Sequence, residues 1–352
     1  MVPAPPSLLV IAKPVEERLR VLIDGELARW GELDPALIAP LASLSGLLLS
    51  GGKRIRPAFC YWAYVGVGGD PEAPLIVDVG AAFELLHAFA LAHDDVMDGS
   101  STRRGHRTAH LVFADTHRER EWIGEARRFG EGVAILIGDL AAVYADVLLR
   151  DAPAAAIAVW NELRIELNLG QYLDLVGTSE GQRDRRDAER IARYKAGKYT
   201  VERPLHVGAA LAAPERAAQL FAPLSAYGLP LGDAFQLRDD LLGAFGDETL
   251  TGKPVGDDLR EGKPTSLLAI ATATTTGVEA AQLARVGAAD LGDDEIAAIQ
   301  RVLLDTGARE ELEAQISALA DEAIAALDCV ELIDAARDAL IELARFVVRR
   351  TA

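Results

Sequence analysis

The stretch from residue 81 to residue 98, AAFELLHAFALAHDDVMD, runs from an apolar segment directly into an acidic cluster. Residues i and i+4 share one face of an α-helix, so a helix here places Asp94 and Asp98 side by side, with Asp95 next to that line. Two carboxylates about 5–6 Å apart repel by roughly 3 kcal/mol at an effective dielectric near 20, so a partly buried pair needs cations or protons. Mg²⁺ is the expected cation, because it binds carboxylate oxygens and completes its shell with water and phosphate.

The composition predicts an all-α protein. Of the 352 residues, 50% are apolar and 6% aromatic, with many Ala and Leu, which favours helices around a substantial core. Helical periodicity recurs along the whole chain and predicts a bundle of ten or more helices. Because no long Ser/Gly/Pro linker and no internal repeat divides the sequence, we expect a flexible N-terminal tail over residues 1–14 and a single domain over 15–352.

Charge and hydropathy exclude several classes of protein. The net charge of −18 argues against a nucleic-acid partner, because phosphate backbones are bound by clustered Lys and Arg. No stretch of 18 or more apolar residues is free of charges, so we expect no membrane span, and the Pro-rich N-terminus lacks the basic region of a secretory signal. Cys60 and Cys329 have no metal-binding spacing, which predicts buried free thiols and a cytoplasmic location.

A second acidic cluster, FQLRDDLLG at residues 235–243, repeats the pattern far downstream. Gln236 and Asp240 are four residues apart and share a helix face, with Asp239 beside them. Lys253 and Lys263 follow in two Gly-Lys-Pro sequences, within a Gly-rich segment suited to closing over bound phosphate. Either lysine alone would most often be solvated, but next to the acidic cluster phosphate contact is the better interpretation.

Basic residues also accompany the first cluster. Arg103 and Arg104 follow it closely, and the planar guanidinium fork matches two phosphate oxygens. GGKRIRP at residues 51–57 places further basic side chains at the start of a predicted helix. A lone DDxxD most often marks a solvated helix face, but carboxylates, guanidiniums and apolar helices together predict a magnesium diphosphate site.

In this order the motifs resemble those of the trans-isoprenyl diphosphate synthases, above all bacterial geranylgeranyl diphosphate synthases, over roughly residues 40–270. The matching residues are Gly52–Pro57, Glu84 with His87, Asp94–Asp98, Arg103–Gly105, Gln171 with Asp174, Lys195, Phe235 and Gln236 with Asp239 and Asp240, and the Gly-Lys-Pro sequences at Lys253 and Lys263. The resemblance implies an isoprenoid synthase-type bundle around a central cavity, commonly a homodimer. It also implies a Mg²⁺-dependent prenyltransferase that condenses isopentenyl diphosphate with allylic diphosphates by head-to-tail 1'-4 elongation.

The resemblance also implies a role for each site residue. Asp94, Asp98 and Asp239 would hold three Mg²⁺ ions on the allylic diphosphate, supported by Asp95 and Asp240. The same diphosphate would be contacted by Arg103, Lys195, Gln236, Lys253 and Lys263, and isopentenyl diphosphate by Lys53, Arg56, His87 and Arg104. These cations would stabilise the departing pyrophosphate while apolar walls keep water from the allylic cation.

Product length is predicted from Phe89 and Ala90, which precede Asp94 by five and four residues. Five helical residues span about 7.5 Å, so Phe89 would lie below the metal site and cap the growing chain, although a core aromatic is the alternative. In the family such an aromatic beside a small residue resembles medium-chain enzymes. We therefore expect geranylgeranyl diphosphate (C20), with farnesyl diphosphate (C15) next.

Two departures from the family pattern leave alternatives open. Gly243 stands where most of the family has the last aspartate of the second motif, and Ala196 stands where Thr or Ser is usual, with Lys198 and Thr200 as candidates to compensate. A class I terpene cyclase would not need the isopentenyl diphosphate residues, and a non-catalytic partner subunit of another prenyl synthase would not need the metal site. Because both sets of residues are present, the prenyltransferase is the leading hypothesis.

Overall fold

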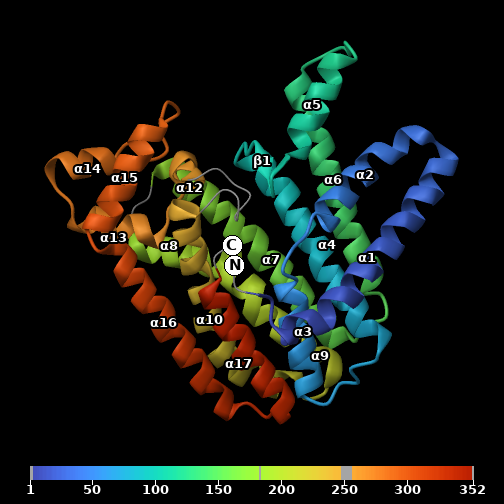
Figure 1. The fold of residues 1–352 in the computed structure, drawn as a ribbon. Coiled ribbons are helices and arrows are strands. Elements are labelled where there is room, and N and C mark those ends of the chain that lie inside the picture. Colours follow the sequence, from blue (N-terminus) through green and yellow to red (C-terminus); the bar gives the residue numbers. More distant parts are fainter. Residues whose placement is uncertain (1–2, 182–183, 247–255, 351–352) are drawn as a thin grey trace. The chain divides into compact units, whose positions relative to one another are not determined.

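The computed structural model describes residues 3–181, 184–246 and 256–350, which are almost entirely helical (Figure 1). The strands among these residues are β1 (Thr102–Arg103) and β2 (His106–Arg107), which form a small antiparallel hairpin. The prediction of an all-α bundle of ten or more helices is confirmed.

The chain divides into two compact units. The amino-terminal unit comprises Pro6–Tyr61 and Asp70–Ala152, and the carboxy-terminal unit comprises Met1–Pro5, Trp62–Gly69 and Pro153–Ala352. The single domain that we expected over residues 15–352 stays a prediction. The sequence-predicted site residues are distributed over both units, so each unit carries its own part of the candidate site.

The amino-terminal unit is a layer of packed helices. They are α1 (Pro6–Leu33), α2 (Ile38–Leu49), the first part of α3 (Ile55–Gly66), α4 (Pro74–Met97), α5 (Ala109–Glu119) and α6 (Ala126–Leu148), with a 3₁₀ turn at Pro35–Leu37. The central helix is α4, which packs against α6 and α1. Gly80 permits the contact with α1, because a Cβ at this position would lie 2.6 Å from the side chain of Val15.

Helix α1 begins at Pro6, within the segment that we expected to be a flexible tail. Leu8, Ile11 and Val15 are at most 3% exposed and recur every three to four residues, so they form the buried stripe of an amphipathic helix. Pro6 is compatible with this start because proline is favoured in the first turn of a helix. Burial of this stripe therefore outweighs the prolines from which the tail was inferred.

Helix α4 is the one helix of the described chain that is long and apolar enough to span a membrane by length and composition. However, 61% of its most apolar window is buried inside the protein. Val79, Phe83 and Leu86 are at most 1% exposed. Such burial is typical of a core helix, and it brings the first acidic cluster to the end of a rigid element.

The carboxy-terminal unit is built around α10. Its elements are the end of α3, α7 (Ala154–Glu180), α8 (Arg185–Ala192), a π-helical stretch (Arg193–Glu202), α9 (Arg203–Ala212), α10 (Ala217–Phe245), α12 (Asp257–Glu261), α13 (Ser266–Thr274), α14 (Gly277–Leu283), α15 (Asp293–Asp305), α16 (Ala308–Ala326), a 3₁₀ turn (Leu327–Cys329) and α17 (Asp334–Arg349). A Cβ on Gly232 of α10 would lie 2.6 Å from the carbonyl oxygen of Gly197. The π-helical stretch that carries Lys195 therefore touches α10 backbone to backbone.

Both cysteines are free thiols. Cys60 is buried on α3, and burial raises the pKa of its thiol. The expectation that Cys329 is also buried is wrong, because this residue lies in an exposed 3₁₀ turn rather than on a packed helix face.

Candidate active site

The first acidic cluster lies at the C-terminal end of α4. The backbone N–H of Asp98 donates to the carbonyl of Asp94 at 2.8 Å, so the two residues are one helical turn apart. Asp95 is 5% exposed and accepts a hydrogen bond from Nε of Arg103 at 2.8 Å, as well as one from Nη2 of the same guanidinium. Nη2 also lies 3.5 Å from Oδ2 of Asp94. Asp95 therefore holds Arg103 against the acidic cluster.

Basic side chains gather around His87, about two turns before Asp94 on α4. Burial lowers the pKa of His87 well below its usual value, and the charges of Arg56, Arg104, Arg103 and Arg54 lower it further. The imidazole is therefore neutral at neutral pH. Burial also lowers the pKa of Arg104, and the charges of Arg54, Arg103 and Arg56 lower it further, against the opposing charge of Glu84. Such a group of partly desolvated cations is suited to an anion as highly charged as a diphosphate.

Arg54 connects this basic cluster to α4. Its backbone has a φ of 52°, and its buried side chain donates from Nη1 to Oε2 of Glu84 at 2.5 Å and from Nη2 to the carbonyl of Leu48 at 2.8 Å. Both members of the ion pair are 4% exposed. Glu84 lies three residues before His87 on α4, so the pair fixes the loop that carries Lys53 beside His87.

Arg104 holds the same loop from another side. Its Nη1 donates to the carbonyl of Gly51 and lies 3.4 Å from the carbonyl oxygen of Leu47. Within the amino-terminal unit the structure thus brings together Arg56, His87 and Arg104, which we predicted to bind isopentenyl diphosphate, with Lys53 in the adjoining loop. Arg54 and Glu84 belong to motifs that match the family, but the sequence analysis assigned neither residue a role, although two charged residues in apolar surroundings are a usable signal.

The second acidic cluster lies near the end of α10. Asp240 is 4% exposed and accepts hydrogen bonds from Nε2 of Gln236 at 2.9 Å and from the backbone N–H of Ser266 at 3.2 Å. Burial raises the pKa of Asp240 to about 7, and the charges of Asp258 and Asp239 add to this effect. Asp240 is therefore a buried residue of α10 that is hydrogen-bonded to the start of α13, and its supporting role at a metal site stays a prediction.

Asp239 contacts the last described residue of the chain. Nη2 of Arg350 donates to its carboxylate and also lies 3.2 Å from the carbonyl oxygen of Phe235. The guanidinium stacks on the Phe235 ring, 3.8 Å from its centroid. The sequence did not indicate Arg350, because the pair Arg349 and Arg350 belongs to none of the recognised motifs.

The lysines predicted to bind phosphate have different surroundings. Nζ of Lys195 lies 2.5 Å from Oδ2 of Asp174 on α7, so the π-helical stretch presents it beside a buried carboxylate. Lys263 lies 2.6 Å from Glu261 and 3.7 Å from Asp258. Lys253 lies outside the described residues.

Lys198 and Thr200 are the candidates to compensate for the hydroxyl missing at Ala196, and they differ in their surroundings. Nζ of Lys198 donates to Oε1 of Glu166, which Arg203 also binds, and Thr200 is fully buried. Thr200 is therefore part of the packed interior and Lys198 is partly buried, and compensation by either residue stays a prediction.

The carboxylates of the first acidic cluster fit magnesium better than a metal that takes all of its ligands from the protein. In the part of the chain that the structure describes, no three His, Cys, Asp or Glu side chains form a cluster that could hold a metal ion. Mg²⁺ is usually bound by one or two carboxylates and takes its other ligands from water and substrate phosphates. A carboxylate pair such as Asp94 and Asp98 suits this mode.

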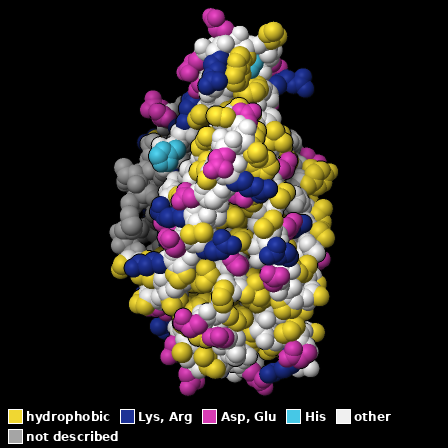
Figure 2. Space-filling model, turned by 90° about the vertical axis from the view of Figure 1, so that its right-hand side faces the viewer, with side chains coloured by type: hydrophobic (Ala, Val, Ile, Leu, Met, Phe, Trp, Pro, Cys, Tyr) yellow, Lys and Arg dark blue, Asp and Glu magenta, His cyan; other side chains and the backbone are white. Residues whose placement is uncertain are grey.

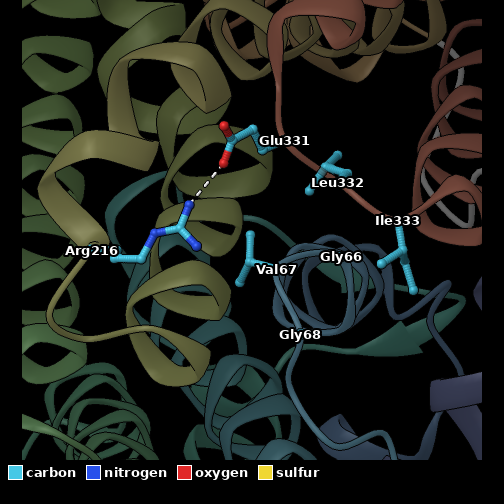
Figure 3. Close-up of a pocket in the computed structure, with 7 residues that line it drawn as sticks. All are labelled: Gly66, Val67, Gly68, Arg216, Glu331, Leu332 and Ile333. Carbon is cyan, nitrogen blue, oxygen red and sulfur yellow. Dashed lines mark hydrogen bonds and ion pairs between the residues drawn. The ribbon is translucent and has the colours of Figure 1, made fainter.

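A surface pocket of about 300 Å³ in the carboxy-terminal unit contains none of these residues (Figure 3). It is lined by Gly66, Val67, Gly68, Arg216, Glu331, Leu332 and Ile333. Arg216 donates to Glu331 at 2.8 Å beside it, and both side chains are at least half exposed. We assign this pocket no part in the candidate site.

Comparison with known proteins shows the family to which the chain belongs. The family model described as polyprenyl synthetase matches residues 40–302. A geranylgeranyl diphosphate synthase of Mycobacterium tuberculosis is 33% identical over 308 residues, which cover 80% of this chain and 82% of that protein. A (2E,6E)-farnesyl diphosphate synthase of Mycobacterium bovis is 31% identical over 310 residues, which cover 86% of this chain and 80% of that protein.

A solved structure is similar over nearly the full length. It is a geranylgeranyl pyrophosphate synthase from Corynebacterium glutamicum, complexed with isoprenyl diphosphate and magnesium. The TM-score is 0.90 at 37% sequence identity, with 97% of this chain and 99% of that chain covered. The relatives share one family but are named for products of different length.

Proposed function

The chain belongs to the polyprenyl synthetase family and is a trans-prenyltransferase, and from this premise we propose that it condenses isopentenyl diphosphate with an allylic diphosphate by head-to-tail 1'-4 elongation. One observation carries the proposal. On α4 the carboxylates of Asp94 and Asp98 lie one turn apart, and about two turns earlier a neutral His87 lies among four arginines. Carboxylates for a hard cation thus lie on α4, and the arginines suited to a diphosphate lie beside the same helix, in residues 54–56 and 103–104.

Magnesium, when bound, would neutralise the allylic diphosphate and stabilise the departing pyrophosphate. We assign three ions to Asp94, Asp98 and Asp239, with Asp95 and Asp240 in support. The magnesium in the complex of the Corynebacterium relative supports the choice of metal.

The cationic side chains then divide between the two substrates. Arg103, held by Asp95, would contact the allylic diphosphate together with Lys195, Gln236, Lys253 and Lys263. Lys53, Arg56, Arg104 and His87 would bind isopentenyl diphosphate. Because its pKa is lowered by burial, His87 would act as a neutral hydrogen-bond donor rather than as a further cation.

The reaction needs a dry site, because water would capture the allylic cation. The double bond of isopentenyl diphosphate attacks that cation, a carbon–carbon bond forms, and a proton leaves to complete the elongated product. Helix α4 is an apolar core helix, because Phe83 and Leu86 are almost fully buried. It would support the residues that border the reacting carbons.

We propose geranylgeranyl diphosphate as the main product, with farnesyl diphosphate next. The support is Phe89, a half-buried aromatic residue five positions before Asp94 on α4, with the small Ala90 next to it in the sequence. In this position the ring would stop the growing chain.

We also propose a homodimer, and the exposed apolar stripes support it. On α6, Leu136, Val143 and Val147 are 51–60% exposed, and on α7, Ile165, Leu169 and Tyr172 are 55–63% exposed at helical spacing. Figure 2, which looks onto the right-hand side of Figure 1, shows hydrophobic side chains among charged ones. Apolar stripes of this kind mark protein interfaces, and a second copy of the chain is the simplest partner. A cytoplasmic location, supported by the free thiols, completes the proposal.

The proposal is tested by incubating the purified protein with Mg²⁺, isopentenyl diphosphate and a C5, C10 or C15 allylic diphosphate, followed by mass spectrometry of the products. We expect elongation up to C20, and none when EDTA removes the metal. Absence of any elongated diphosphate from all three starters would refute the proposal.

A further inference from the structure

Gly243 and Asp258 compete for the same space in the carboxy-terminal unit. Gly243 lies on α10, three residues after Asp240, where the family pattern has a further aspartate. A Cβ built on Gly243 would lie 1.8 Å from Oδ2 of Asp258 and 2.4 Å from its Cγ. The carboxylate of Asp258 thus lies where the side chain of residue 243 would otherwise begin.

The two positions are held by the same neighbour, α15. Nε2 of Gln300 donates to the carbonyl of Ala244 at 2.6 Å, which fixes the end of α10. Gly256, the residue before α12, has a φ of 72° and packs so closely on Ile296 that a Cβ would lie 2.6 Å from that side chain. Because α15 anchors both segments, the approach of Asp258 to Gly243 is part of the packing.

Asp258 also faces the groups assigned to the diphosphate. Its side chain is 17% exposed, and its Oδ1 lies 3.7 Å from Nζ of Lys263. Its backbone carbonyl accepts a hydrogen bond from the N–H of Lys263 at 3.1 Å. Gly243, beside which its carboxylate lies, is about one helical turn after Asp239 and Asp240 on α10. The carboxylate thus lies next to both the acidic cluster and a predicted phosphate-binding lysine.

We propose that Asp258 supplies, as a supporting residue, the carboxylate that Gly243 lacks beside Asp239 and Asp240 of the second acidic cluster. The carboxylate comes from α12 instead of α10, and glycine at 243 is the change that makes room for it. This inference rests on the proposed function, because it assigns Asp258 to the magnesium diphosphate ligand.

The proposal predicts that substitutions at the two positions depend on each other. Gly243→Asp alone would place a second carboxylate against Asp258, and Asp258→Ala alone would leave the cluster one carboxylate short. The double variant Gly243→Asp/Asp258→Ala would move the carboxylate back to α10 without a collision. Each substitution alone would therefore weaken metal binding, whereas adding it to the other variant would restore binding.

The test compares these three variants with the wild type and with Asp257→Ala, a control that removes the neighbouring carboxylate on α12. Binding of Mn²⁺ in the presence of inorganic pyrophosphate is measured by electron paramagnetic resonance, and folding is checked by circular dichroism. We expect each of the two single variants to bind Mn²⁺ about 10-fold or more weakly, the size of effect typical of groups that support a metal site. The double variant should recover most of this loss, and Asp257→Ala should bind like the wild type.

Three results would overturn the inference. They are unchanged Mn²⁺ binding in Asp258→Ala, a double variant as weak as the weaker single variant, and a wild type that binds no Mn²⁺ with pyrophosphate. If Asp258 served only to orient Lys263, a carboxylate at position 243 would not restore binding. Because pyrophosphate binding requires no condensation, failure of the proposed reaction with the expected binding pattern would refute the function and leave this inference standing.

Discussion

The imidazole of His93 lies against the ring of Phe89, with the two centroids 4.6 Å apart and the planes tilted by 58°. Nε2 of His93 donates to the carbonyl of Ile135 on α6 at 2.9 Å. Gly138 makes room for this contact, because a Cβ there would lie 2.4 Å from the imidazole. Phe89 is thus supported from α6, which a fixed stop for a growing prenyl chain requires.

Replacing Phe89 by alanine should lengthen the product beyond C20, because the stop below the acidic cluster is removed. Chromatography and mass spectrometry of the prenyl diphosphates would show the shift. The control is Phe129→Ala, which makes the same change in an aromatic cluster with His117 and Trp122 on α5, α6 and their connection. A Phe89→Ala enzyme with the wild-type product pattern would show that Phe89 is only a core residue.

Breaking the Arg54–Glu84 pair should destabilise the protein strongly. Removing one partner of a buried ion pair leaves an uncompensated charge and costs about 3–5 kcal/mol, whereas replacing both by apolar residues costs much less. We therefore expect Arg54→Met and Glu84→Gln to lower the free energy of unfolding, and Arg54→Met/Glu84→Leu to be milder. Urea unfolding would measure all three.

The same variants test whether the pair positions the substrate loop. We expect the KM for isopentenyl diphosphate to rise more than kcat falls, because Lys53 and Arg56 lose their fixed positions. The control is Arg20→Ala, which breaks an exposed pair with Glu16 and should leave both the stability and the KM for isopentenyl diphosphate nearly unchanged. A double variant with wild-type KM would contradict the positioning role.

Acid should destabilise the protein through His206 on α9. This side chain is 3% exposed, its Nε2 lies 3.1 Å from the carbonyl oxygen of Phe221, and Nη1 of Arg203 lies 3.4 Å from its Nδ1. Burial, with a smaller effect of the Arg203 charge, lowers the pKa of His206 to about 4. Between about pH 6.5 and pH 4 the unfolded chain therefore binds more protons than the folded one.

The stability that depends on neutral His206 is complete above about pH 6.5 and falls as the pH drops, by about 2 kcal/mol between pH 6.5 and pH 5. Urea unfolding at several pH values would show a shallower pH dependence for His206→Gln than for the wild type. Equal slopes in the two proteins would show that this histidine does not contribute.

Charges placed on the exposed stripe of α7 should dissociate the proposed homodimer. We expect Leu169→Glu to convert a dimer into a monomer in size-exclusion chromatography with light scattering. Val21→Glu on α1 is the matched control, because Val21 is equally exposed, at 59% compared with 58%, but lies outside the two stripes. A monomeric wild type, or a Leu169→Glu variant that stays dimeric, would rule out this surface.

Strong periodicity predicted the helices that carry the acidic clusters, and spacing predicted that Asp94 and Asp98 share a face. Taken alone, the dense charges of mixed sign in residues 114–128 indicate an exposed connection. In the structure, however, α5 extends to Glu119 and α6 begins at Ala126. The buried stripe of α5 consists of His110, Ala114 and His117. A short stripe of one alanine and two histidines within a charged segment is weak evidence for a buried helix in a sequence.

The partners within the site were harder to predict than its motifs. Arg350 contacts Asp239 although the two residues are 111 positions apart along the chain. Asp258 lies beside Gly243, 15 residues away. No local pattern connects either pair. The Arg54–Glu84 pair lay within recognised motifs, but only its burial shows that it joins the substrate loop to α4. Such contacts depend on how the helices pack.

The central claim is that Asp94, Asp98 and Asp239 hold the allylic diphosphate through magnesium. A crystal structure with Mg²⁺ and an unreactive thiolo analogue of an allylic diphosphate tests this most directly. We predict magnesium ions about 2.0–2.1 Å from carboxylate oxygens of all three aspartates and from the diphosphate oxygens. A diphosphate bound without metal contact to these carboxylates, or bound elsewhere, would contradict the account.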